Sequence, residues 1–160
     1  MDFDDFFRAE QPRMVALALA LTGVPEVARD IAQESLIKAH RMWPSVSAME
    51  HPGGWLRAVT INLAMTWHRS NRREAVARSR VGPQPSVTMP ETEGEAFWRA
   101  VRGLPARQQA VVSLYYLEDQ SVAAVGAALG IAEGTVKAAL FKARASLAVA
   151  LGVVHAEEGE

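Results

Sequence analysis

The chain has 160 residues, and its 17 basic and 18 acidic side chains give it a net charge of −1. Hydrophobic residues make up 49% of it, which is too many for a disordered chain, and the length suits one ordinary domain or two small ones. The sequence contains no cysteine, which excludes disulfides, thiol catalysis and thiolate metal sites. It has no apolar run of the roughly 18 residues that a membrane span needs, and its acidic start differs from a signal peptide, so we expect a cytoplasmic protein.

The N-terminal part of the chain is predicted to form three helices. Pro25 suits the first turn of the second helix, Pro44 is expected to end it, and a loop should follow from 45 to 52. The predicted bounds of the helices are about 2–21, 25–43 and 55–71, with an extension of the third to 79 left open.

The charge along the chain is unevenly spread. Between 57 and 80 only Glu74 opposes six arginines, which suggests a restricted contact with nucleic acid. A solvated, arginine-rich helix end is the alternative. The six are Arg57, Arg69, Arg72, Arg73, Arg78 and Arg80.

A segment without apolar periodicity follows, from Val81 to Glu95, and contains three prolines. We interpret it as a flexible linker, which at about 15 residues spans at most ~50 Å. Few contacts are expected to cross it, so the two flanking parts should behave independently. A long surface loop within one domain is the alternative.

The C-terminal part is predicted to hold four helices, at about 95–103, 105–117, 121–129 and 133–150. Apolar residues recur at helical spacing on both sides of Gly130, a pattern typical of a helix-turn-helix. Gly126 is small enough to let the two helices approach closely. The second helix carries polar, basic and aromatic residues suited to a DNA groove, namely Thr135, Lys137, Phe141, Lys142 and Arg144. Two amphipathic helices packed in a bundle would give a similar pattern.

Three segments in this order resemble the small extracytoplasmic-function (ECF, group IV) sigma factors of bacterial RNA polymerase. They are PEVARDIAQESLIKAHRMW, GGWLRAVTINLAMTWHRSNRRE and the helix-turn-helix. The resemblance implies an all-α fold of two small helical domains joined by a flexible linker. It implies a sigma-2-like domain at 1–80 for the polymerase core and the −10 element, a linker at 81–94, a sigma-4-like domain at 95–152 for the −35 element, and an acidic tail at 153–160.

Asp30, Gln33 and Glu34 lie at i, i+3 and i+4 and therefore share one polar face of the second helix. In the family that face docks on the clamp helices of the polymerase's largest subunit, where charge-assisted hydrogen bonds would hold it. A solvated helix face is the alternative.

For the −10 element, the resemblance implicates Asn62 and Trp55, with the loop 45–53 as a candidate cradle for an unstacked base. An asparagine can recognise a base edge through its donor and its acceptor. Core packing is the favoured role for Trp55 and Trp67. Phosphate contacts are expected from Arg69, Arg72 and Arg73.

The chain departs from the family pattern at several positions. Thr66 replaces a usual acidic residue, and Arg29 stands where one is frequent. Ala132 replaces a helix-capping Ser, which removes about 1 kcal/mol of stabilisation. Ala138-Ala139 replaces Ser-Arg in the −35 helix, so that one basic contact is expected to be missing.

The sequence therefore predicts a sigma factor that binds core polymerase and promoter DNA, with an anti-sigma factor as a further candidate partner. We expect this protein to have no catalytic role and to need no cofactor. The alternative is a sigma-like protein-interaction module with weak DNA binding. An enzyme lacks support, because the sequence shows no nucleophile–base pair or phosphate loop. The histidines also lack metal-site spacing; they are His40, His51, His68 and His155.

Overall fold

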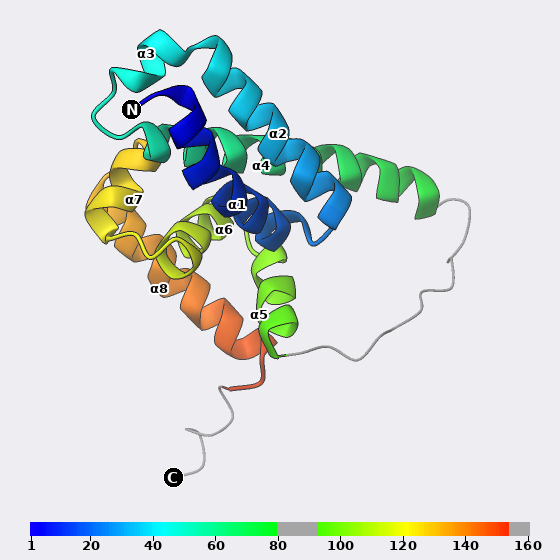
Figure 1. Cartoon of the computed structure of the whole chain (residues 1–160). Coiled ribbons are helices and arrows are strands. Elements are labelled where there is room, and N and C mark those ends of the chain that lie inside the picture. The colour runs from blue at the N-terminus through cyan, green and yellow to red at the C-terminus, as the bar shows by residue number, and fades with distance from the viewer. Residues whose placement is uncertain (80–92, 154–160) are drawn as a thin grey trace.

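The structure, a computed structural model, describes residues 1–79 and 93–153, and within these ranges the chain is helical and has no strand. This confirms the predicted all-α class. The N-terminal unit consists of α1 (Phe3–Thr22), α2 (Pro25–Arg41), α3 (Trp43–Ser47) and α4 (Pro52–Ser79). The C-terminal unit consists of α5 (Glu93–Arg102), α6 (Ala106–Val112), the π-helical η1 (Ser113–Leu117), α7 (Val122–Leu129) and α8 (Glu133–Ala150). Figure 1 shows the two units side by side.

Helix α1 has clear local signals at both ends. The side chain of Asp2 accepts a hydrogen bond from the amide of Asp5 at 2.9 Å, which caps the first turn. The helix stops at Gly23, which takes the left-handed conformation with φ of +73°. The first loop is therefore short, and α2 starts at Pro25 and packs back along α1.

The core of the N-terminal unit lies where α1, α2 and α4 meet. The apolar side chains there are almost fully excluded from solvent, which removes them from water and supplies most of the stabilisation of the bundle. The largest are Met14, Leu17, Leu21, Leu36 and Leu56.

Pro44 does not end α2, which already stops at Arg41. It lies in the first turn of the short helix α3, where its missing amide proton is not needed for a helical hydrogen bond. The predicted loop 45–52 is shortened accordingly. Gly53 and Gly54 lie inside the first turn of α4, which begins at Pro52.

Helices α7 and α8 form the predicted helix-turn-helix. Their axes differ by 105°, within the range of this motif. Gly130 ends α7 with φ of +67°, and Ser121 caps its start, whereas Ala132 gives α8 no side-chain cap. No single helix in the described ranges is long and apolar enough to cross a membrane; this bent pair passes the same test by length and composition only.

The two units pack on each other, which corrects the expectation that few contacts join them. Helix α7 packs on α4, and both α5 and η1 contact α1. One buried apolar cluster contains Leu17 and Leu56 from the first unit and Val125 and Leu140 from the second. The segment expected to be a linker lies outside the described residues, except that α5 already begins at Glu93.

We predict opposite effects for two glycines of the helix-turn-helix. A Cβ at Gly126 would lie 2.8 Å from the carbonyl oxygen of Ile131, whereas a Cβ at Gly134 would meet nothing within 4 Å. Gly126→Ala should therefore lower the free energy of unfolding by about 1–3 kcal/mol, since backbone must move. Gly134→Ala should raise it by about 0.5 kcal/mol through the better helix propensity of alanine. Urea denaturation of the two variants tests this, and equal effects would contradict the close approach.

Candidate nucleic-acid interface

The predicted polar face of α2 is present as expected. Asp30, Gln33 and Glu34 are all exposed, whereas Ile31 and Ser35 on the opposite side are buried. Ile37 belongs with the exposed face, because 43% of it is accessible. The face is therefore not purely polar.

Beside this face lies a groove of about 590 Å³ between α1 and α2. Its floor includes Phe3, Phe7 and Ile37, and Arg29 and Arg41 add positive charge to its lining. Sequence reasoning missed the aromatic part, although Phe3 and Phe7 are spaced four residues apart and so share one face of a helix. An apolar groove with a charged edge suits an amphipathic helix of a partner protein.

On α4, Asn62 and Thr66 stand one turn apart on the exposed surface. The Thr66 hydroxyl donates to the carbonyl of Asn62 at 2.9 Å and accepts from the guanidinium of Arg69 at 3.1 Å. Thr66 thus orients Arg69 and leaves its positive charge uncompensated. An acidic residue at this position would neutralise that charge. Arg72 and Arg73 are also exposed, so this end of α4 offers three cationic side chains.

A smaller pocket of about 390 Å³ connects the two surfaces just described. It lies between α2 and α4 and is lined by Glu34 and Lys38 on one side and by Asn62 and Thr66 on the other. The residues expected to bind polymerase and those expected to bind the −10 element are therefore immediate neighbours in space.

Trp55 and Trp67 are half-buried and pack against the core, as favoured from the sequence. The ring of Trp55 is not an open stacking platform. It lines a cleft of about 780 Å³ between the start of α4 and α7, which also includes Glu50, His51 and Gly53 of the candidate cradle.

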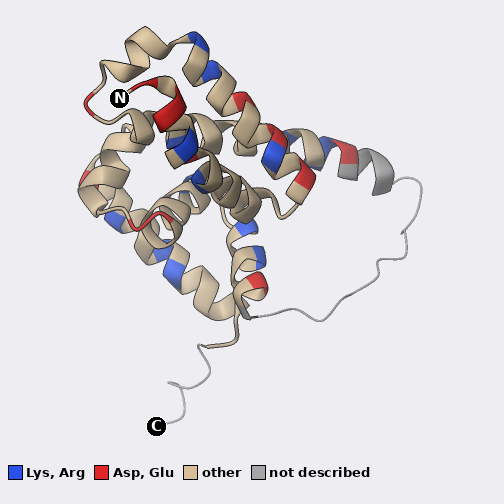
Figure 2. Cartoon of the chain, viewed as in Figure 1, with Lys and Arg blue, Asp and Glu red and all other residues tan. Residues whose placement is uncertain are grey.

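Arg57 has to be removed from the predicted basic surface. Only 8% of the residue is accessible, and its guanidinium lies between two carboxylates. The side chains of Arg78 and Arg80 lie outside the described residues. The positive surface of α4 that the structure describes thus consists of Arg69, Arg72 and Arg73, and Glu74 follows them in the sequence. Figure 2 shows basic and acidic positions close together near the end of this helix.

On α8, Lys137, Phe141 and Lys142 are exposed, and Thr135 is half-buried. Phe141 is 76% accessible, which rules out the alternative that it packs into the core. An exposed aromatic ring between two lysines is unfavourable in water. It suits the major groove of DNA, where the ring can contact a thymine methyl group and the lysines can contact phosphates.

The two alanines of α8 differ in environment. Ala138 is exposed, whereas Ala139 is 7% accessible and packs in the core. The expectation that an arginine at 139 would add a DNA contact is therefore wrong, because position 139 points into the protein.

Arg144 stands slightly apart from the other α8 residues. Its Nε donates to the hydroxyl of Tyr116 at 2.7 Å, and its guanidinium lies near the faces of Tyr115 and Tyr116. The hydrogen bond with Tyr116 raises the pKa of Arg144 above its usual value. The side chain remains exposed and charged, and the tyrosines fix its position. Within residues 1–79 and 93–153, no three His, Asp or Glu side chains come close enough to hold a metal ion.

Comparison with known proteins identifies both units. Sigma-70 region 2 matches residues 6–74, and Sigma-70 region 4 matches residues 94–147. The ECF RNA polymerase sigma factor SigM of Mycobacterium tuberculosis is 30% identical over 154 residues, which cover 96% of this chain and 79% of that protein. The RNA polymerase sigma-E factor of Streptomyces coelicolor is 28% identical over 149 residues, which cover 92% of this chain and 84% of that protein.

A solved structure gives the same result in three dimensions. The sigma factor RpoE of Bartonella quintana, in complex with the anti-sigma factor NepR, superposes with a TM-score of 0.74 at 26% identity. The match covers 95% of this chain and 98% of that one, so both units are included. The exposed constellations on α2, α4 and α8 thus occur in a chain that belongs to the ECF sigma factors of RNA polymerase.

Proposed function

We propose that this sigma factor, which directs core RNA polymerase to promoters, divides its work among three helices. The face of α2 with Asp30, Gln33 and Glu34 binds the polymerase core. The exposed side of α4 binds the −10 element, and that of α8 binds the −35 element. The single observation that supports this best is the exposure of all three constellations on a chain whose regions 2 and 4 match the family.

Promoter opening needs a base held out of the stack next to a phosphate backbone held in place. Asn62 would recognise a base edge, while Arg69, Arg72 and Arg73 bind phosphates. Because Thr66 carries no charge, the full positive charge of Arg69 is available to DNA. Trp55 contributes by shaping the start of α4 and the cradle rather than by stacking.

In the −35 helix, Lys137 and Lys142 would reach phosphates or guanine edges and Phe141 a thymine methyl. Arg144, which Tyr116 holds in place, would bind the backbone at one edge of the site, and Thr135 would position the first turn. These contacts act through binding energy alone, so the protein needs no catalytic residues and works where RNA polymerase works, in the cytoplasm. The domain bounds 1–80 and 95–152 remain part of this proposal.

An anti-sigma factor is proposed as a further partner. The supporting observation is that this chain superposes in full on a sigma factor bound to one. The alternative, an interaction module with weak DNA binding, depends on the absence of an arginine at Ala138-Ala139. It loses much of its basis because Ala139 is buried and an arginine there would need a different local packing.

Reconstituted transcription tests the function directly. Core polymerase with the purified chain, on a library of promoter fragments, should give discrete start sites that share sequence at −10 and −35. A core-binding protein that yields no start sites on any fragment would refute the promoter role.

Reversal of one charge on the α2 face should weaken core binding. Glu34→Lys replaces an exposed acceptor with a cation and should raise the half-competing concentration against a labelled sigma factor about tenfold, with unchanged helicity. Glu133→Lys makes the same change on the other unit and should leave competition unchanged. If the two variants compete equally well, α2 is not the core-binding face.

Arginine substitutions at two neighbouring positions of α8 should have different effects, because Ala138 is exposed and Ala139 is buried. Ala138→Arg should strengthen −35 binding and steepen its salt dependence by about one phosphate contact. Ala139→Arg should instead lower the free energy of unfolding by about 2 kcal/mol or more, because it forces a charge into the core. DNA titrations at several salt concentrations and thermal unfolding measure both. A stable, tight-binding Ala139→Arg protein would contradict this orientation of α8.

A further inference from the structure

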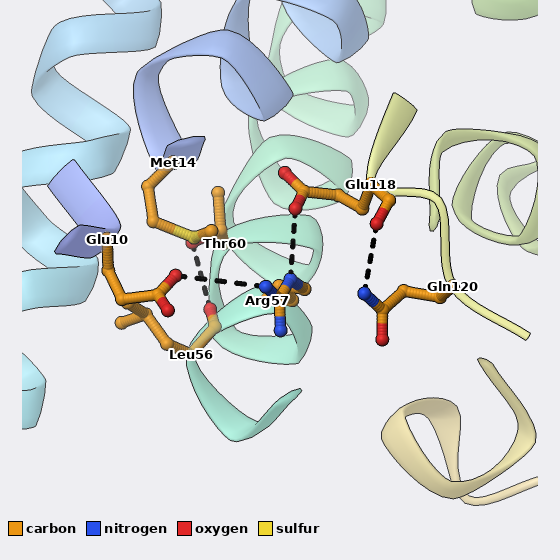
Figure 3. Close-up of polar contacts among 7 residues, drawn as sticks. All are labelled: Glu10, Met14, Leu56, Arg57, Thr60, Glu118 and Gln120. Atoms are coloured by element: carbon orange, nitrogen blue, oxygen red, sulfur yellow. Dashed lines mark hydrogen bonds and ion pairs between the residues drawn. The ribbon is translucent and has the colours of Figure 1, made fainter. Parts of the chain in front are cut away.

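Arg57 connects the two halves of the chain at a buried point. It lies on α4, and its Nε donates to the Oε2 of Glu118, which follows η1 in the C-terminal unit, at 3.1 Å. Its terminal nitrogen lies 3.9 Å from the Oε2 of Glu10 on α1. The three side chains are only 9%, 6% and 12% accessible, in the order Arg57, Glu118, Glu10. Figure 3 shows the guanidinium between the two carboxylates.

A second cation makes a separate contact between the units. The guanidinium of Arg102, at the end of α5, donates to the carbonyl oxygen of Ala20 at 3.0 Å, in the last turn of α1. A cation at a helix C-terminus interacts favourably with the helix dipole and with its unpaired carbonyls. Burial, and then the nearby Arg99, lower the pKa of Arg102, but an arginine remains charged at physiological pH.

The closed arrangement is incompatible with simultaneous contact to both promoter elements. Helices pack 8–10 Å apart, so α8, which packs on α7, lies about 20 Å from α4, on which α7 packs. Promoter elements centred 25 base pairs apart are separated by about 85 Å along B-form DNA at ~3.4 Å per step. The units must therefore separate before both elements are bound.

The α4–α7 contact also borders the candidate cradle at Gly53, whereas Glu50 and His51 stay exposed. The alanine-rich side of α7, with Ala123, Ala124 and Ala127, faces Gly53 and Trp55 across the cleft. In the closed arrangement, α7 stands over the start of α4.

We propose that Arg57, Glu10 and Glu118 form an intramolecular latch that holds the free sigma factor closed and that opens when the chain engages polymerase and promoter. The apolar cluster that both units share adds to the stability of the closed state. A buried ion group suits such a switch, because its desolvation cost offsets most of its attraction and leaves a small net stabilisation. After opening, Arg57 keeps Glu10 as its partner within the N-terminal unit, and only the contact to Glu118 is lost. The inference rests on the proposed promoter function for its purpose, but not for its geometry.

Two variants break the latch in different ways. Glu118→Ala removes the partner from the C-terminal unit and leaves Arg57 paired with Glu10. Arg57→Met keeps apolar volume but leaves two carboxylates facing each other, which favours separation. Asp119→Gly is the matched control, because it removes the adjacent exposed carboxylate at a residue with φ of +52°, a conformation that glycine adopts freely.

Distance measurements on the full chain test the latch. Since the sequence contains no cysteine, Ala48→Cys and Ser146→Cys, both at exposed positions, allow one dye in each unit. The free chain should show one high-transfer population and a radius of gyration of about 15 Å, the value for a compact chain of this length. Glu118→Ala and Arg57→Met should shift it toward low transfer and a larger radius, with circular dichroism unchanged. Asp119→Gly should not.

The same variants should affect promoter use. Because only the open population binds both elements, Glu118→Ala should lower the concentration needed for half-maximal transcription about three- to tenfold, and Asp119→Gly should leave it unchanged. An extended free wild-type chain, or Glu118→Ala behaving like Asp119→Gly in both measurements, would overturn the latch. Opening by Glu118→Ala in a chain that supports no transcription would keep the latch and remove the promoter function instead.

Discussion

The guanidinium of Arg57 is buried between carboxylates from both halves of the chain, and this contact bears on how the two units pack and on which basic side chains remain exposed. An arginine out of water is tolerated only when it is paired, and here its pairing spans 61 residues of sequence. This contact lies beside the buried apolar cluster that both units share, and together they hold α7 against α4. It also withdraws Arg57 from the positive surface, so the charge available to DNA is concentrated toward the other end of α4.

The proposed polymerase face on α2 and the proposed −10 face on α4 share a pocket, whereas the proposed −35 face on α8 belongs to the other unit. Residues such as Glu34 and Asn62 line the same cavity. In the proposed function, binding of core to α2 therefore also positions the −10 residues. In the proposed latch, contact of α8 with the −35 element requires the two units to separate. The −35 contact then carries a free-energy cost of opening that the −10 contact does not.

Much of the fold could be predicted because the signals are local. The ends of α1, α7 and α8, the helix-turn-helix and the exposed face of α2 follow from glycines, a proline and apolar spacing. The contact between the units could not be predicted, since nothing local marks Glu118 as the partner of Arg57. The opposite environments of Ala138 and Ala139 depend on how α8 is rotated against its neighbours, and the π-helical turn at η1 depends on tertiary packing. The DNA and polymerase roles of the predicted residues remain proposals.

Gly23 has two structural roles: it ends α1, and it leaves room for the side chain of Arg102. Its positive φ ends α1, and its missing side chain leaves space for Arg102, whose guanidinium carbon would lie 2.9 Å from a Cβ there. Variation at this position is constrained by the backbone and by the neighbouring unit at once. An asparagine, which tolerates the left-handed conformation, would satisfy the first constraint, but the flexible end of Arg102 would have to move to make room for it. A side chain at this point should therefore shift the guanidinium of Arg102, which contacts the last turn of α1.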